Sequence, residues 1–322
     1  MSFWNKYRSW FSIAARYLIG VLIVAWLLNA DLINPKVLDL INIRIASIAT
    51  LFVLIQLFLA GWRVHLLLAA HDISVGIWRC IAYNTVGIFY SLFLPGGMSG
   101  DLARAYCFWR AYPAASKSAL FGALFVDRLL GTVAMIFMGL LSGTFLMTAL
   151  GLQKFVITSW IGFVVLGVGY FLVIRLHHRG DKTNTGFVGR VLRFIEKIDL
   201  QGYSARVIGI SAMLSLTGHL CAVVVIYLFS GLMHSGLDFL QVVTVSPIGL
   251  LANALPLTPG GVGIGEKGFD LLYGMIGGSQ GGNSFLLSRV FLFSPACLGA
   301  IVVSSQFIQS HRAIFFNHSS KK

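Results

Sequence analysis

Seven ionisable side chains stand inside or beside long apolar stretches of this sequence, where charge is unusual. They are Asp101, Arg104, Asp127, Arg128, His219, Glu266 and Arg289. If these stretches cross a membrane, each charge is costly to bury, and such residues are usually paired and functional. An arginine at that depth could hold a lipid phosphate through its planar guanidinium group. A carboxylate there could balance an arginine or take a proton.

The spacing of the first four charges predicts which of them pair. Asp101 and Arg104 lie three residues apart, which places them on one face of a helix. Asp127 and Arg128 are adjacent in sequence and so face different directions on a helix. We therefore expect these two to pair elsewhere, with Arg104 and Asp101 as the candidate partners. Such pairs could bind substrate, or they could only hold neighbouring helices together.

The remaining charges leave similar alternatives open. Arg289 is expected to pair with Glu266, again either for binding or for structure. Asp101 and Glu266 each begin a helix-compatible stretch, where an acidic residue is an ordinary cap. His219 stands in an apolar stretch, so it is either an interhelical hydrogen-bonding residue or a proton relay.

One short pattern occurs twice and ends each time on one of these carboxylates. The copies are residues 95–101, PGGMSGD, and residues 259–266, PGGVGIGE. Non-helical backbone at membrane depth persists only where protein buries it or where it lines a polar cavity. Amides freed at the following helix starts could bind an anion such as a phosphate. Asn84 and Asn253 precede the breaks and are expected to satisfy backbone groups. The candidate binding residues within the two copies are Pro95, Gly96, Gly97, Gly100, Pro259, Gly260, Gly261 and Gly263.

Composition indicates a polytopic membrane protein, because 57% of the residues are hydrophobic and the mean hydropathy is +0.84. The formal net charge of +13 lies mostly in loops, which is typical of the positive-inside rule and not of a nucleic-acid-binding protein. The sequence shows no C-x-x-C pair, no metal-ligand cluster and no enzymatic constellation. We therefore expect no cofactor, no metal and no enzymatic activity.

Apolar segments predict the elements that position the charged residues. A membrane span needs about 20 apolar residues, and six segments meet or approach this: about 10–30, 45–62, 119–147, 155–174, 207–231 and 284–308. The segment between Arg63 and Arg79 is expected as a loop at the inner face. Residues 81–94 are too few to span, and basic residues lie on both sides of them. The first Pro-Gly-Gly pattern therefore predicts a re-entrant hairpin from the inner face, and the second predicts one from the outer face.

The predicted fold class is an all-α polytopic membrane protein with six full spans and two re-entrant broken-helix hairpins in an inverted repeat. Residues 1–150 form the first half-repeat, and residues 151–174 and 207–322 form the second. Residues 175–206 form a basic cytoplasmic loop with seven Lys and Arg. The whole chain, 1–322, is expected to be one integral membrane domain with both termini in the cytoplasm.

Three ordered motifs resemble the lysylphosphatidylglycerol synthase transmembrane (flippase-like) family. They are residues 93–104, FLPGGMSGDLAR, residues 127–131, DRLLG, and residues 256–266, PLTPGGVGIGE. In the best-known members such a domain precedes a soluble aminoacyl-transferring domain and moves the modified lipid to the outer leaflet. The sequence ends at Lys322, so we expect a stand-alone member without the synthase domain. The resemblance implies a bacterial inner-membrane flippase that moves a phospholipid or other anionic lipid between leaflets.

The alternative is a non-transporting membrane scaffold that partners a lipid- or glycan-synthesising enzyme, with residues 175–206 as the docking surface. Under either hypothesis a membrane lipid is the expected small-molecule partner, and a nucleic acid is not. A second copy of the chain is a further candidate partner.

Overall fold

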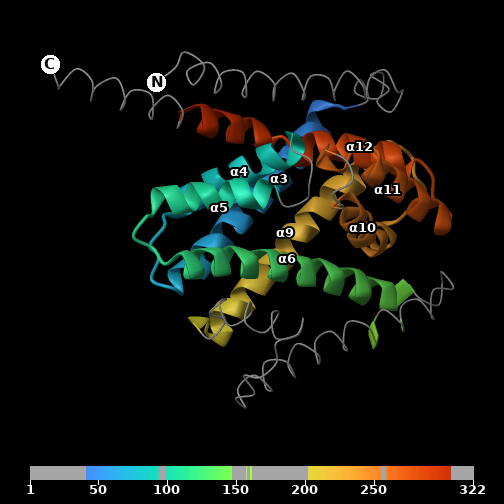
Figure 1. Cartoon of the computed structure of the whole chain (residues 1–322). Helices are drawn as coiled ribbons and strands as arrows, with labels where there is room; N and C mark the ends of the chain where they lie inside the picture. The colour runs from blue at the N-terminus through green and yellow to red at the C-terminus, as the bar shows by residue number, and fades with distance from the viewer. Residues whose placement is uncertain are drawn as a thin grey trace.

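The computed structural model describes residues 41–93, 99–146, 157, 160–161, 202–254 and 259–305, and every element among them is helical (Figure 1). The first group is α3 (Ile43–Ala69), α4 (Ile77–Phe93), α5 (Ser99–Ala111) and α6 (Lys117–Leu146). The second group is α9 (Ala205–Leu232), α10 (Phe239–Asn253), the short 3-10 helix η2 (Pro259–Gly261), α11 (Ile264–Met275) and α12 (Gly281–Leu292). Residues 295–305 are again helical after a turn at 293–294.

Four of the described helices are long and apolar enough to cross a membrane. They are Ile43–Ala69, Lys117–Phe145, Ala205–Leu232 and Gly281–Ser305. They correspond to four of the six predicted spans, which supports the predicted helical, multi-pass membrane protein. The other two predicted spans, 10–30 and 155–174, lie almost entirely outside the described residues, as does most of the basic loop 175–206.

The length of α3 corrects the placement of Arg63. The helix continues to Ala69, so Arg63 lies inside it with a side chain only 14% exposed, and not in a loop at the inner face. Its charge is compensated by Asp127 of α6, whose Oδ1 lies 2.6 Å from Arg63 Nε. Counting basic residues assigns such an arginine to a loop, because a sequence does not reveal which arginines have a buried partner.

Helices α3 and α9 cross the middle of the bundle side by side and run antiparallel (Figure 1). Near the end of α3, Arg63 donates a hydrogen bond of 2.6 Å to Ser215, which lies in the first half of α9. Near the start of α3, Ala49 and Val53 pack in one cluster with Val225 and Phe229 of α9. The pairs therefore run in opposite order along the two helices, as antiparallel packing requires.

Helices α4 and α5 form an antiparallel hairpin around the first glycine-rich break. Tyr83 packs edge-to-face on Phe108 with ring centroids 4.8 Å apart, and Arg79 donates to the hydroxyl of Tyr112 at 3.0 Å. Near residues 94–98 the two helices approach closely at Gly87 of α4 and Gly100 of α5. A Cβ on Gly100 would overlap the carbonyl oxygen of Gly87, so this approach requires glycine. The helices on either side of residues 94–98 are therefore packed antiparallel, while re-entry from the inner face stays a prediction.

The second hairpin, α10 and α11, is packed against α12. The ring of Phe269 in α11 fills the space that a side chain at Gly249 of α10 would need. The ring of Phe285 in α12 stacks on the ring of Phe269, with centroids 4.3 Å apart and planes inclined by 11°. Gly281, at the start of α12, sits against the backbone carbonyl of Phe269. One buried aromatic side chain thus joins all three helices.

Each hairpin is also covered by the last long helix of the other group. Gly139 of α6 lies against Pro247 of α10, where an added Cβ would come within 3.0 Å of the proline ring. Gly299, in the helical stretch 295–305, lies directly against the carbonyl oxygen of Thr85 in α4. Small residues permit this close approach between helices, as is common in membrane proteins.

The close contact between Gly87 and Gly100 predicts the effect of an added methyl group. Gly100→Ala is expected to lower the melting temperature in detergent by several degrees, since overpacking of this kind costs about 1–3 kcal/mol. The matched control is Gly209→Ala in α9, a helical glycine with no described atom within 4 Å of the added methyl. The control is expected to leave the melting temperature unchanged or slightly raised, because alanine favours helix over glycine. Equal changes of melting temperature in the two variants would contradict a close contact between Gly87 and Gly100.

Candidate functional site

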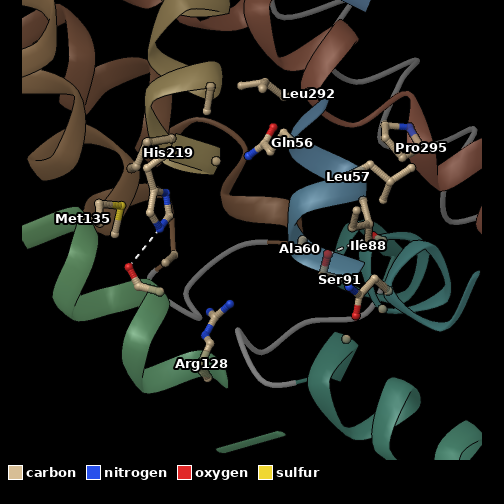
Figure 2. Close-up of a pocket in the computed structure, with 18 of the residues that line it drawn as sticks. Gln56, Leu57, Ala60, Ile88, Ser91, Arg128, Met135, His219, Leu292 and Pro295 are labelled. Atoms are coloured by element: carbon tan, nitrogen blue, oxygen red, sulfur yellow. Dashed lines mark hydrogen bonds between the residues drawn. The ribbon is translucent and has the colours of Figure 1, made fainter. Parts of the chain in front are cut away.

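A cavity of about 470 Å³ lies between the two groups of helices. Its walls come from α3, α4, α5 and α6 on one side and from α9, α10, η2 and α12 on the other. Figure 2 shows Gln56, Arg128 and His219 around the open space, with Leu292 and Pro295 at its edge. Because no single helix encloses it, the cavity depends on how the two groups pack.

Asp127 of α6 is the centre of the first charged cluster. Its Oδ1 accepts a hydrogen bond of 2.6 Å from Arg63 Nε of α3, and its Oδ2 accepts one of 2.9 Å from Arg104 of α5. Arg104 also donates to Asn84 of α4 at 3.0 Å. Asp127 is 2% exposed and Arg104 is 7% exposed, so a single carboxylate joins three helices in a buried environment.

Asp101 extends the same cluster towards the cavity. It lies 3.3 Å from Arg104 and 3.6 Å from the Nε of Arg128. These contacts confirm the pairings predicted from spacing, with Arg104 and Asp101 as the partners of Asp127 and Arg128. The side chain of Arg128 is 57% exposed and that of Asp101 is 31% exposed, whereas that of Arg104 is 9% exposed. Arg128 is therefore the arginine of this cluster that a ligand in the cavity can reach.

The second charged cluster joins Glu266 of α11 to Arg289 of α12, as predicted. Arg289 Nε lies 2.9 Å from Glu266 Oε1, as an ion pair without an aligned hydrogen bond. The other carboxylate oxygen of Glu266 accepts the backbone amide of Gly263 at 2.7 Å, so Glu266 is both a helix cap and a counter-ion. Arg289 also donates to Asn253 of α10 at 2.6 Å and to the carbonyl of Gly260 at 3.0 Å.

The backbone of the second break requires glycine. Gly260 and Gly261 have φ angles of 60° and 71°, in the left-handed region that side chains disfavour. A Cβ at Gly261 would also overlap the backbone carbonyl of Asn253. The left-handed turn directs two carbonyl groups at Arg289, which lies 3.0 Å from the oxygen of Gly260 and 3.3 Å from that of Gly261. These two carbonyls of η2 are thus satisfied by a cation.

His219 of α9 bridges to α6 at the cavity wall. Its Nε2 donates to the carbonyl oxygen of Gly131 at 2.8 Å, and the dashed line in Figure 2 marks this bond. A carbonyl can only accept, so Nε2 carries the proton in this arrangement. The interhelical hydrogen bond is one of the two roles predicted for His219, while the proton-relay role stays a prediction.

The structure brings most of the predicted site residues together. Those that line the cavity are Gly100, Asp101, Arg104, Asp127, Arg128, His219, Gly260 and Gly261. Gly263, Glu266 and Arg289 belong to the second cluster, which contacts the cavity through Asn253 and the two glycine residues of the break. Pro95, Gly96 and Gly97 lie outside the described residues, and Pro259 is described only as backbone.

Sequence reasoning missed Arg63 and Gln56 as site residues, and it missed the arginine partners of Asn84 and Asn253. Arg63 and Gln56 line the cavity from α3. The side-chain oxygens of Asn84 and Asn253 accept hydrogen bonds from arginines, which was not predicted. The sequence could have pointed to these residues through their polar character, because a polar side chain inside an apolar helix needs a polar partner.

These observations define a multi-pass helical membrane protein with a charged cavity between two packed groups of helices. Residues 13–299 match the family model described as the lysylphosphatidylglycerol synthase TM region. The chain therefore belongs to this family, as its three motifs indicated. The comparison with curated proteins returned no match, and neither did the comparison with solved structures.

The position of Asp127 predicts a large loss of stability on its neutralisation. Asp127→Asn leaves Arg63 and Arg104 without their shared carboxylate, and breaking a buried ion pair costs about 3–5 kcal/mol. We expect a fall in melting temperature in detergent, measured by the loss of monodisperse protein after heating. The control is Asp270→Asn, whose side chain is 52% exposed and 4.0 Å from Lys267. Exposed pairs contribute little, so a control shift as large as that of Asp127→Asn would refute the buried role.

Proposed function

We propose that this protein is a lipid translocase that moves a phospholipid or other anionic lipid between the leaflets of a bacterial inner membrane. The observation that carries the proposal is the cavity itself, which lies between the two groups of helices and has charged and polar side chains, including a half-exposed arginine, in a mainly apolar lining. A volume of about 470 Å³ suits a headgroup, while the acyl chains would stay in the surrounding lipid. The chemistry required is binding and release, so no enzymatic activity is proposed.

The three arginines predicted to meet phosphate would then have different roles. Arg104 and Arg289 have side chains 9% and 8% exposed, and each contacts a carboxylate and an asparagine. Their contacts favour the alternative in which they hold a hairpin to the bundle. Among the described residues, the side chain of Arg128 forms one ion pair, at 3.6 Å with Asp101, and it is 57% exposed. Arg128 would therefore be the residue that holds the lipid phosphate.

The spacing of the helices supports an inverted repeat as the transport framework. Helices α9, α10, α11 and α12 begin at residues 205, 239, 264 and 281, against 43, 77, 99 and 117 for α3, α4, α5 and α6. The offsets are 162, 162, 165 and 164 residues. Such a constant offset favours two copies of one four-helix unit.

The directions of the equivalent helices support the inversion. Helix α3 packs antiparallel to α9, its equivalent in the other copy. In Figure 1, α6 runs from left to right, whereas α12 and its continuation run from right to left. Repeats of opposite orientation, with broken helices meeting at a shared site, allow a transporter to expose that site to each side in turn. Both hairpins would then be re-entrant, from opposite faces.

The two charged clusters follow the same offset. Arg104 and Glu266 are 162 positions apart, and so are Asp127 and Arg289. Each copy thus joins the second arm of its hairpin to the next helix through an ion pair, with the signs of the charges exchanged. Equivalent bonds in the two copies suit a protein whose two hairpins take equivalent roles.

The inverted topology predicts that two loops lie on opposite faces of the membrane. In a cysteine-free background, Ala114→Cys between α5 and α6 should be protected in intact spheroplasts, because that loop would be cytoplasmic. Ser279→Cys between α11 and α12 should be labelled there by a membrane-impermeant maleimide. Both positions are exposed, and labelling after lysis controls for reactivity. Labelling of both or neither in intact spheroplasts would contradict the topology.

Translocation is tested directly in proteoliposomes with acyl-chain-labelled phospholipids. We expect an anionic lipid to change leaflets faster than in protein-free vesicles. Arg128→Gln should slow this lipid about tenfold, since losing one ionic contact of about 1.4 kcal/mol changes a rate by that factor. Equal rates with and without protein, across several headgroups, would overturn the proposal.

The matched control is Arg110→Gln. Arg110 is exposed on α5, contacts Tyr106 and is not among the residues that line the cavity. This variant removes the same charge from a neighbouring helix, so it should move lipid at the rate of the unchanged protein. A similar loss in both variants would point to overall charge instead of the cavity.

A further inference from the structure

The charges on the cavity wall do not cancel. Among the described residues the lining contains three arginines, Arg63, Arg104 and Arg128, and two aspartates, Asp101 and Asp127. The second cluster is neutral in itself, because Glu266 and Arg289 carry opposite charges and lie 2.9 Å apart. The part of the cavity wall that the structure describes therefore has one positive charge in excess.

The excess charge has a definite position. Asp127 is shared by Arg63 and Arg104 at 2.6 and 2.9 Å. Asp101 is shared by Arg104 at 3.3 Å and Arg128 at 3.6 Å. Of these five residues, Arg128 makes the longest ion-pair contact and has the most exposed side chain. The uncompensated charge is thus at Arg128, facing the cavity (Figure 2).

The rest of the lining offers neutral hydrogen-bonding groups. Gln56 of α3 lies across the cavity from Arg128 in Figure 2, and its amide both donates and accepts. Ser91 of α4 and His219 of α9 also line the space. Residues 94–98 and 255–258, which lie outside the described residues, contain no charged side chain in the sequence. Within the described lining, every carboxylate already has two arginine partners, so a cationic headgroup would find no unpaired anion.

We infer that the cavity selects a lipid phosphodiester with one net negative charge and an uncharged headgroup, and that Arg128 sets this preference. The inference rests on the proposed translocase function and specifies its substrate class. One anionic phosphate brings the loaded site to neutrality. A zwitterionic lipid would leave one charge uncompensated, which is costly where the dielectric is low.

The test compares two lipids that share acyl chains and differ in headgroup charge. Phosphatidylglycerol carries one net negative charge and phosphatidylethanolamine carries none at pH 7. Both are supplied with the same fluorophore on one acyl chain, in vesicles of otherwise identical composition. The unchanged protein is expected to move phosphatidylglycerol about tenfold faster, as one additional ionic contact in a partly buried site would give.

Two variants of one residue separate charge from structure. Arg128→Gln brings the charge of the described lining to zero, so the preference should fall to about twofold or less or reverse in favour of the zwitterionic lipid. Arg128→Lys keeps the charge and should retain the preference for phosphatidylglycerol. Because the side chain of Arg128 is 57% exposed, neither change leaves a buried group unpaired. Melting temperatures of both variants check that the fold is intact.

The outcomes distinguish this inference from the proposed function. If the unchanged protein moves both lipids equally, or if Arg128→Gln keeps the original preference, the selectivity inference is overturned while translocation stands. If the unchanged protein moves neither lipid faster than protein-free vesicles, the proposed function fails, and this inference fails with it. A reversed or abolished preference in Arg128→Gln, with retention in Arg128→Lys, supports both.

Discussion

The arrangement of the first four described helices depends on the carboxylate of Asp127. It holds Arg63 of α3 at 2.6 Å and Arg104 of α5 at 2.9 Å while belonging to α6 itself. Two arginines that share one carboxylate cannot both be neutralised by it, so Arg104 needs the additional oxygen atoms of Asn84 and Asp101. The requirement to satisfy buried charge therefore extends from helix to helix until it reaches the cavity at Arg128.

The same requirement applies at the second glycine-rich break. Backbone carbonyls outside a regular helix lack intrahelical partners, and an apolar surrounding supplies none. In the second break the carbonyls of Gly260 and Gly261, which belong to the short helix η2, are held by Arg289. Arg289 is balanced by Glu266, which in turn caps the next helix at Gly263. Arg289, Glu266 and the backbone of the second break thus satisfy one another, and removing any one of them would leave the others without a partner.

Much of this could be predicted from sequence, because charges in apolar segments have few candidate partners. The pairs of Asp101 with Arg104 and of Glu266 with Arg289 follow from spacing and from the scarcity of opposite charges. The contact of Arg63 with Asp127 did not follow, since it joins residues 64 positions apart and lies beyond the segment counted as a span. The cavity could not be predicted either, because it depends on packing between helices distant in the chain.

Each helical hairpin is packed against a helix of the other group, and this has a consequence for biosynthesis. The carbonyl of Thr85 in α4 is covered by Gly299, which is translated more than 200 residues later. Pro247 of α10, by contrast, meets Gly139 of α6, which has already emerged from the ribosome. The first hairpin therefore waits for residues near the end of the last described helix, whereas the second meets α6 as soon as it is made and then needs only α12, the next helix along the chain. Assembly is completed from the carboxyl-terminal side.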